Sequence, residues 1–530
     1  MSHSKLDTTS GFVTRGNKDQ VMKENVFALN DFPAFIFLTI FCGIAIIYFS
    51  AYWFSFNDLL THPFSFSLLT LIIFTRIANS QAKWFTLPFM KKPLPVDPAK
   101  GLRVGVVTTI VPWAESLEML EETLRAMIVM DYPHDTWVLD EGDDERVKEL
   151  CDRLGVFHFS RKNIPEYQTG SGIFQSHTKH GNYNAWFFEI GFKQYDVITT
   201  FDPDHVPIPS FLLNVIGYFK DSAVGYVQAA QVYYNQQASF IAQGAAEETY
   251  EYYSCTQMAA GSLGQPAMVG CHNTHRVTAL KSIGGFAAHD ADDLLTGLRY
   301  QSAGWKGIYL PRILAKGLTP VDWNGYLTQQ RRWARSVIDV KFKLRNLVDG
   351  VLPRHGWAIN FLHGLFYIQN SITTFIGILL LVYMLASGSV PQAIRPSLLP
   401  RLALLFAAIQ ACALFRQKFY LHPQSEHGIH LRAALLRYAK WPVFLLALRD
   451  VVIGRRVPYA LTRKIKEKPG ARLLIIPHSA CVFFVTLAFV TGKALGHSVP
   501  SLLYWVAGGV VITSASLIFS TKLNYPPPYE

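Results

Sequence analysis

Long apolar stretches constrain this chain more than any other feature of its sequence. Residues 34–54 are 21 consecutive uncharged positions, and about 20 such residues are enough for a helix to cross a bilayer. Only 16% of all residues are charged, against about 25% in soluble domains. We therefore expect an α-helical membrane bundle with two spans early in the chain (within 27–83) and four late (two in 357–416, two in 473–520).

Basic residues near these spans predict the topology. The link at residues 55–61 has no Lys or Arg, whereas Lys91, Lys92, Lys100 and Arg103 follow the second span and residues 416–472 are rich in both. Cytoplasmic loops carry an excess of Lys and Arg over loops on the outer side. We expect an inner (plasma) membrane protein with its central segment and both termini cytoplasmic, residues 1–26 forming an N-terminal tail. We attribute the net charge of +11 to basic residues that flank the spans and face the lipid bilayer, which is the expected partner. We expect no nucleic-acid partner.

The central segment, residues 96–333, reads as an α/β domain. The apolar, β-branched runs at 104–111, 136–139 and 197–201 are typical of buried parallel strands. They alternate with helical patterns at 117–129 and 209–219, which indicates a doubly wound, Rossmann-like fold. Such sheets bind ligands beyond the carboxyl ends of their strands.

Carboxylates follow two of these predicted strands. Asp140 closes one strand, where it can reach a nucleoside, and Asp202 and Asp204 follow another. Two carboxylates spaced in this way can hold a hard divalent cation such as Mg²⁺ or Mn²⁺ against a diphosphate. Each group also has a purely structural explanation, as a capped turn or as favourable charge in a first helical turn.

Two further motifs lie downstream. Asp293 ends an acidic cluster in which like-charge repulsion raises the carboxyl pKa, as a general base requires, although an N-terminal helix cap explains it equally well. Gln329, Arg332 and Trp333 begin an amphipathic interfacial helix at 322–356. Arg332 can pair with a departing phosphate and Trp333 can stack on a sugar ring, but both residue types are also common at membrane surfaces.

Taken in order, Glu115, Asp140, Asp202, Asp204, Asp293 and Gln329-x-x-Arg332-Trp333 resemble the processive family 2 glycosyltransferases: cellulose, chitin and hyaluronan synthases, with bacterial cellulose synthase catalytic subunits closest. Lys179-His-Gly-Asn-Tyr-Asn184 is similar to the KxGNxN loop of that family, and Gly284-Gly-Phe286 also matches. The resemblance implies a GT-A domain at 96–333. It also implies that Glu115, Asp140, Lys179, Asp202, Gln329, Arg332 and Trp333 bind substrate, and that Asp293 is the base.

A weaker match involves Tyr459, Thr462 and Lys464, which are similar to the gating loop of cellulose synthase within the expected cytoplasmic segment 417–472. Two positions depart from the family pattern. Ala291-Asp292-Asp293 stands in place of TED, and residues 270–275 are unlike the usual acceptor-site sequence, which points to a different acceptor. Because ten residues follow the last span, no cyclic di-GMP-binding β-barrel is expected.

The resemblance implies an inverting transfer from a UDP-sugar, UDP-glucose being the first candidate, to a growing β-linked extracellular polysaccharide that leaves through the spans. Export proteins are possible partners. Two alternatives stay open: a non-processive glycosyltransferase that modifies a lipid, and a non-catalytic transporter or scaffold.

Overall fold

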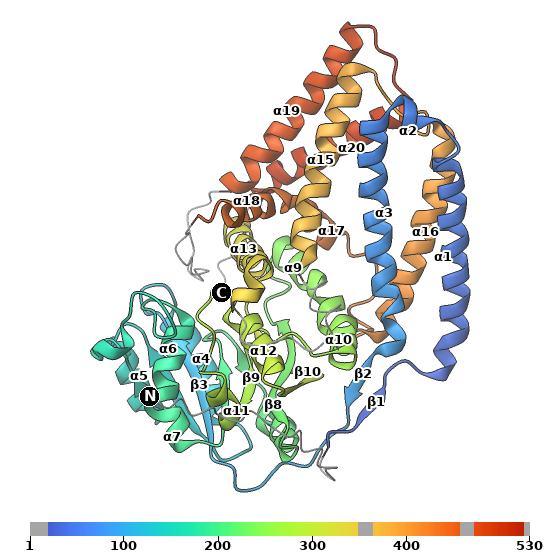
Figure 1. Ribbon diagram of the computed structural model, residues 1–530. Coiled ribbons are helices and arrows are strands. Elements are labelled where there is room, and N and C mark those ends of the chain that lie inside the picture. Colours follow the sequence, from blue (N-terminus) through green and yellow to red (C-terminus); the bar gives the residue numbers. More distant parts are fainter. Residues whose placement is uncertain (1–19, 348–363, 456–470, 524–530) are drawn as a thin grey trace, which may run out of the picture.

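The computed structural model describes residues 20–347, 364–455 and 471–523. An α/β part and a bundle of long helices lie at opposite ends of the molecule, and shorter helices join them (Figure 1). This arrangement confirms the predicted fold class, an α/β domain inserted in an α-helical bundle.

An eight-stranded sheet forms the centre of the α/β part, in the order β5-β4-β3-β6-β9-β8-β10-β7. The first four strands are parallel, β9 runs antiparallel to both neighbours, β10 is parallel to β8 and β7 antiparallel to β10. The sheet is therefore mixed rather than uniformly parallel. Its strands are β3 (Val104–Ile110), β4 (Asp135–Asp140), β5 (Phe157–Phe159), β6 (Val197–Phe201), β7 (Val206–Pro207), β8 (Val224–Tyr233), β9 (Asn273–Arg276) and β10 (Lys306–Gly317).

Helices connect these strands, and local signals fix their ends. Ser116 caps α4 by accepting a hydrogen bond from the Met119 amide (3.2 Å), and Gly155 ends α5 in the left-handed conformation. The predicted helix at 209–219 is a short α-helix continued by a 3₁₀ turn. These helices are α4 (Leu117–Ile128), α5 (Glu145–Leu154), α6 (Lys179–Trp186), α7 (Phe192–Gln194), α8 (Phe211–Val215), α9 (Phe240–Glu251), α10 (Gln257–Leu263), α11 (Val277–Ser282) and α12 (Asp292–Ser302).

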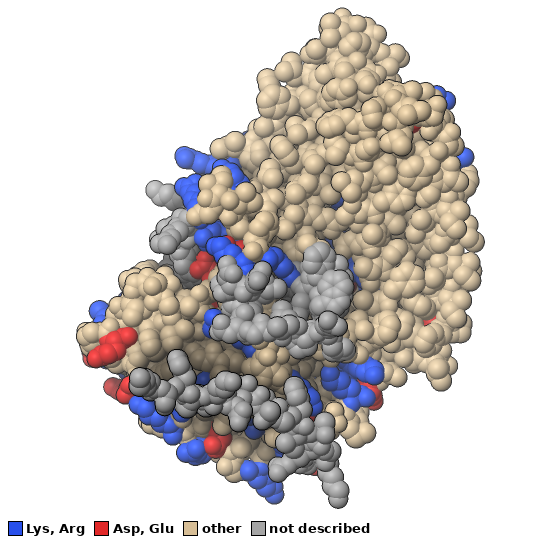
Figure 2. Space-filling view, in the orientation of Figure 1, with Lys and Arg blue, Asp and Glu red and all other residues tan. Residues whose placement is uncertain are grey.

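Six helices in the described residues are long and apolar enough to cross a membrane, two before the sheet and four after it. Figure 2 shows charged side chains over the α/β part and over the region where it meets the long helices, whereas most of the visible surface of the long helices is uncharged. The long helices are α1 (Phe32–Trp53), α3 (Pro63–Phe85), α15 (Leu365–Ser387), α16 (Leu399–Arg416), α19 (Arg472–Ala494) and α20 (Ser501–Ser520). A short α2 (Asp58–Thr61) links the first pair, and β1 (Lys23–Asn25) pairs with β2 (Lys91–Pro93) below them.

Three helices make up the junction: α13 (Trp323–Leu347), α17 (Leu431–Ala439) and α18 (Trp441–Val452) (Figure 1). The 12 residues of α18 rise about 18 Å, too little for a core of about 30 Å, so this segment does not span a bilayer. Helix α13 packs against α18, α15 and α19. It is more buried than the predicted surface helix, because Leu327, Ala334 and Ile338 face the helices of the junction.

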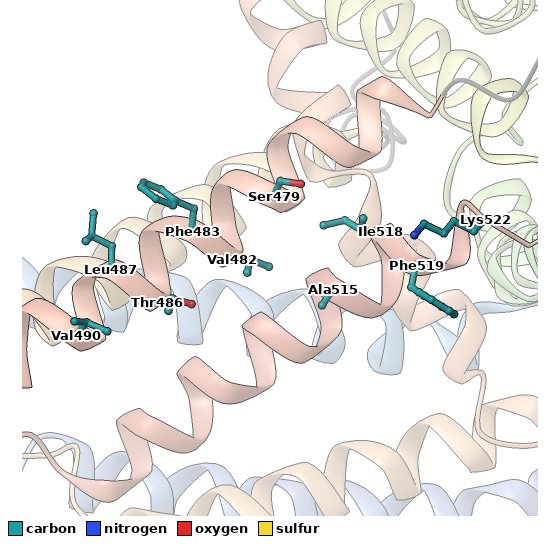
Figure 3. Close-up of a pocket in the computed structure, with 10 residues that line it drawn as sticks. All are labelled: Ser479, Val482, Phe483, Thr486, Leu487, Val490, Ala515, Ile518, Phe519 and Lys522. Carbon is teal, nitrogen blue, oxygen red and sulfur yellow. The ribbon is translucent and has the colours of Figure 1, made fainter.

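An apolar groove of about 630 Å³ lies between α19 and α20. Figure 3 shows side chains of both helices, such as Phe483 and Ile518, around it, with Lys522 at one end. None of its lining residues is a predicted site residue.

Candidate active site

An acidic cluster follows β6, where the chain turns at Asp202-Pro203-Asp204-His205. Asp202, Asp204 and His205 offer ligand atoms that all lie within 4.8 Å of one another. Asp204 is buried and accepts hydrogen bonds from the Leu318 amide and from Nδ1 of His205, both at 3.1 Å. Asp202 is more exposed. Two carboxylates and an imidazole suit a hard divalent cation, with Asp202 as the accessible ligand.

Lys179 faces this cluster from the start of α6. Its ammonium donates to Asp202 and to the carbonyl of Gly270. The helix is held in place because Asn182 donates to the Leu139 carbonyl (3.2 Å) and the Tyr183 hydroxyl to the Phe201 carbonyl (2.8 Å). Burial opposes the charge of Lys179, but Asp202 outweighs it and raises the lysine pKa well above its usual value.

Asp293 lies in the first turn of α12, on the other side of Gly270. A Cβ placed on Gly270 would be 3.4 Å from Oδ2 of Asp293 and 3.5 Å from Nζ of Lys179. Burial, together with repulsion from neighbouring Asp292, raises the pKa of Asp293 to about 7. This is the property of a general base that works near neutral pH. Asp202, Lys179 and Asp293, predicted from separate motifs, are therefore brought together.

Asp140 is fully buried at the end of β4. Its carboxylate accepts hydrogen bonds from the amides of Gly142 (2.8 Å) and Asp144 (2.6 Å), and His158 Nε2 lies 3.2 Å away. In this structure Asp140 shapes the turn after β4. A pocket of about 590 Å³ opens on that turn, lined by Pro112, Trp113, Glu141, Gly142, Asp143, Asp144, Arg146, Lys162, Gln168 and His177.

Glu115 belongs to the loop after β3, which forms another wall of this pocket. Its Oε2 accepts a hydrogen bond from the Val111 amide (2.8 Å), which closes the loop. The exposed Trp113 and His177 rings face each other edge to face across 6.4 Å. Aromatic rings placed in this way offer a surface against which a flat base can stack.

Gln329, Arg332 and Trp333 lie half-buried in the first half of α13. The residues beside them join this helix to two other parts of the molecule. Arg331 donates to Asp450 of α18 (2.6 Å), and Arg335 donates to Asp290, three residues before Asp293 (2.9 Å). Helix α13 thus connects α18 with the loop that precedes the predicted base.

Tyr459, Thr462 and Lys464, the predicted gating residues, lie outside the described residues. Some residues of the site were not predicted. Glu141 forms a buried ion pair with Arg161, Gly270 separates Lys179 from Asp293, and His205 completes the acidic cluster. His205 and Glu141 directly follow predicted residues, and Gly270 begins the segment 270–275 that departs from the family pattern, so each had a signal in the sequence. Nothing in the sequence pattern indicated Arg161.

Comparisons with known proteins identify the family to which this domain is similar. A family model described as glycosyltransferase like family 2 matches residues 105–336. The chain is 26% identical to a UDP-forming cellulose synthase catalytic subunit of Xanthomonas axonopodis over 262 residues, which are 48% of this chain and 34% of that protein. A second such subunit, from Komagataeibacter sucrofermentans, is 26% identical over 403 residues, 72% of this chain and 49% of the relative. The chain thus spans between a third and a half of the length of these relatives.

Among solved structures, a mannosyltransferase from Pyrobaculum calidifontis, in complex with GDP-mannose and Mn²⁺, is similar with a TM-score of 0.53 at 15% identity. The match covers 75% of this chain and all of that one, and it supports the fold alone. Family model, relatives and sheet topology lead to one conclusion: residues 105–336 form a family 2 glycosyltransferase domain of the GT-A fold.

Proposed function

We propose that this protein is a processive, inverting polysaccharide synthase of the inner membrane. It uses a UDP-sugar, with UDP-glucose as first candidate, and passes the growing β-linked chain through its own helices. The observation that carries this proposal is the position of α13, whose residues contact both Asp290 beside the predicted base and Asp450 of the junction. These contacts support a product path from the site along α13 toward the long helices. The domain and both termini are then cytoplasmic.

In the proposed reaction Asp293 removes the proton from the acceptor hydroxyl. The oxygen then attacks the anomeric carbon of the donor, and UDP leaves on the opposite face, which inverts the configuration. The pKa of about 7 suits Asp293 to this task near neutral pH. Lys179, which already contacts Asp202, contributes positive charge beside the leaving diphosphate.

The donor set of Asp202, Asp204 and His205 fits a divalent cation, Mg²⁺ or Mn²⁺, since its ligand atoms converge within 4.8 Å. Such a cation neutralises charge on the departing diphosphate when bound. Asp202 offers its carboxylate from the accessible side, whereas the contact of Asp204 with the Leu318 amide keeps its carboxylate in place.

The pocket beside Asp140 suits the nucleoside. Its volume of about 590 Å³ is in the range of small-ligand sites, and Trp113 and His177 flank it. Asp140 and Glu115 hold the two loops that form its walls. The relatives are named as UDP-forming enzymes, which supports UDP as the nucleotide.

Gln329, Arg332 and Trp333 are proposed to hold the acceptor end where the domain meets the helices, with Arg332 able to pair with phosphate. Tyr459, Thr462 and Lys464 are proposed as gating residues, on the resemblance of their segment to the gating loop of cellulose synthase. Export proteins would take the polymer from the far side of the membrane.

The test is incubation of the purified protein, in lipid nanodiscs, with a panel of radiolabelled UDP-sugars and Mg²⁺ or Mn²⁺. We expect UDP release and a product of many sugars, with a linkage that methylation analysis identifies. Asp293→Asn serves as the inactive control that still binds UDP. A lipid carrying one sugar would contradict processivity, and no UDP release from any donor would favour the non-catalytic scaffold.

A further inference from the structure

A second set of metal-binding side chains lies beside the acidic cluster. His205, Cys271 and His272 offer one nitrogen or sulfur atom each, and these atoms lie within 4.8 Å of one another. All three residues are buried, none more than 2% exposed. Cys271 and His272 immediately precede β9, and His205 follows the Asp-Pro-Asp turn, so the set joins two neighbouring loops of the sheet.

The outer contacts of the two imidazoles fit metal binding. Nδ1 of His205 faces Asp204 Oδ1 at 3.1 Å, and Nε2 of His272 faces the Ala230 carbonyl at 3.1 Å. Metal-binding histidines commonly donate their other ring N–H to a carboxylate or a carbonyl in this way. Nδ1 of His272 is then left with a lone pair, and among the described residues this buried atom has no hydrogen-bond partner.

The tautomer of His205 is set by a chain of contacts. The Tyr253 hydroxyl donates to Oε1 of Gln231 (2.8 Å), so the amide nitrogen of Gln231 is the atom that faces Nε2 of His205 at 3.2 Å. An amide nitrogen can only donate. Nδ1 of His205 therefore carries the proton that Asp204 accepts, and Nε2 carries a lone pair, which accepts from Gln231 here and becomes available to a metal when that amide turns aside.

We propose that His205, Cys271 and His272 bind a borderline-soft divalent cation, Zn²⁺ being the natural candidate. One thiolate and two imidazoles are typical zinc ligands, at about 2.0–2.3 Å from the metal. Tetrahedral geometry at those lengths separates ligand atoms by about 3.5 Å. Small side-chain movements are therefore enough to bring ligand atoms that now lie within 4.8 Å of one another to that separation. A fourth position stays open for water.

This site is distinct from the proposed Mg²⁺ or Mn²⁺ site: with Nε2 on zinc and Nδ1 protonated, His205 is no ligand of the second cation, which the carboxylates of Asp202 and Asp204 then hold. His205 also lies within 4.8 Å of Asp202 and Asp204, and its proton on Nδ1 connects it to Asp204. The two sites prefer different cations, because a thiolate ligand favours Zn²⁺ and carboxylate ligands favour Mg²⁺ or Mn²⁺. Zinc at Nε2 would fix the ring of His205 and, through Nδ1–H, the orientation of Asp204.

Cobalt tests the proposal, because Co²⁺ bound to a thiolate gives a charge-transfer absorption in the near ultraviolet. We expect the metal-free, full-length protein in detergent to develop this band with one equivalent of Co²⁺. Added Zn²⁺ should abolish the band, and Mg²⁺ should leave it. Absence of a band in the wild-type protein overturns the proposal, whatever the variants do.

Variants then locate the site. Cys271→Ser and His272→Gln should lose or shift the band. Cys151→Ser, which changes another buried, free cysteine of the same domain, should retain it. Asp202→Asn should also keep it, because Asp202 belongs only to the carboxylate site. A band that persists in folded Cys271→Ser, or disappears in folded Cys151→Ser, would contradict the assignment; circular dichroism and gel filtration identify unfolded variants.

Discussion

Arg161 and Glu141 form a buried, two-pronged ion pair: Nε lies 2.9 Å from Oε2, and Nη2 lies 2.8 Å from Oε1. The guanidinium of Arg161, fully enclosed, also donates to the carbonyls of Tyr167 (3.1 Å), Phe174 (3.2 Å) and Gln175 (3.1 Å). One side chain thus ties the loop that precedes Lys179 to the wall of the pocket beside Asp140.

Replacing Arg161 tests this organising role. Arg161→Met leaves Glu141 buried without its partner, and loss of one member of a buried pair costs about 3–5 kcal/mol. We expect a fall of this size in the free energy of unfolding, together with weaker UDP binding. Arg161→Lys should recover little of either, because an ammonium cannot reproduce the planar fork.

Arg153→Met is the matched control. Arg153 pairs with Glu121 at 2.8 Å, but its side chain is 61% exposed, and exposed pairs contribute little. Chemical denaturation followed by tryptophan fluorescence, with calorimetric titration of UDP, compares the three variants. Equal effects of Arg153→Met and Arg161→Met would contradict a special role for the buried pair.

The pH dependence of transfer should follow Asp293. Its pKa of about 7 is raised by burial and then by Asp292, so the carboxyl is protonated below that pH and cannot accept the acceptor's proton. We expect kcat/KM to fall about tenfold per pH unit on the acid side and to level off above pH 7. Initial rates from pH 5 to about 9, with UDP binding measured in parallel, separate catalysis from donor affinity.

Asp292→Asn tests whether Asp293 controls the pH dependence, because it should shift the acid limb in a known direction. Removing the neighbouring charge removes a repulsion that raises the pKa of Asp293, so the acid limb should move to lower pH. A limb that stays in place, or moves to higher pH, would mean that another group controls the rate.

Much of the architecture could be predicted because its signals are local. The spans are long apolar runs with few charged residues, and β3 and β6 are apolar runs whose residues are all buried. Strand β9 was missed, since its sequence is Asn-Thr-His-Arg. Asn273 accepts from the Thr200 hydroxyl (2.5 Å), and His275 contacts the Tyr300 hydroxyl (3.0 Å). These polar side chains are buried because they satisfy one another, and only the folded sheet reveals the partners.

For the candidate site, the sequence indicated which side chains come close together but not what each of them contacts. Asp202, Lys179 and Asp293 converge, yet Asp140, expected to contact the nucleoside, has both carboxylate oxygens engaged by the turn after β4. Spacing places a residue at the end of a strand but does not say which way its side chain points. The amphipathic pattern of α13 likewise indicated a helix without indicating that several sides of it are covered.

Lys179 should affect cation and nucleotide binding in opposite directions. In the present arrangement its ammonium contacts Asp202, so it opposes a second positive charge there. We expect Lys179→Met to bind Mn²⁺ more tightly in the absence of nucleotide, by about tenfold, or 1.4 kcal/mol, and to bind UDP more weakly. Electron paramagnetic resonance of free Mn²⁺, with and without UDP, measures both effects.

Lys193→Met is the control for charge alone, because Lys193 is exposed and pairs with Glu189 at 3.6 Å. It should change neither affinity. If Lys179→Met weakened Mn²⁺ and UDP binding together, Lys179 would be supporting the fold of the site rather than competing with the cation.

The contact between Arg331 and Asp450 should matter for both stability and transfer. Asp450 is buried, and although burial opposes its charge, hydrogen bonds from Arg449 and Arg331 hold its pKa below the usual value. This contribution to stability is present above the pKa of the unfolded chain and is lost as pH falls through the folded value. We expect Arg331→Met to lower the free energy of unfolding by about 1–3 kcal/mol and to slow transfer, because α13 also carries Arg332 and Trp333.

Two further variants distinguish the ion pair from the helix that carries it. Lys343→Met changes an exposed pair with Asp339 on the same helix (2.8 Å), so stability and transfer should stay near wild type. Arg331→Met combined with Asp450→Leu replaces the pair with apolar side chains, which often restores stability. We expect that double variant to unfold at a higher denaturant concentration than Arg331→Met alone. A double variant that loses as much as the two single changes added together would mean that Arg331 and Asp450 act independently, and that α13 is held to the junction by its apolar contacts.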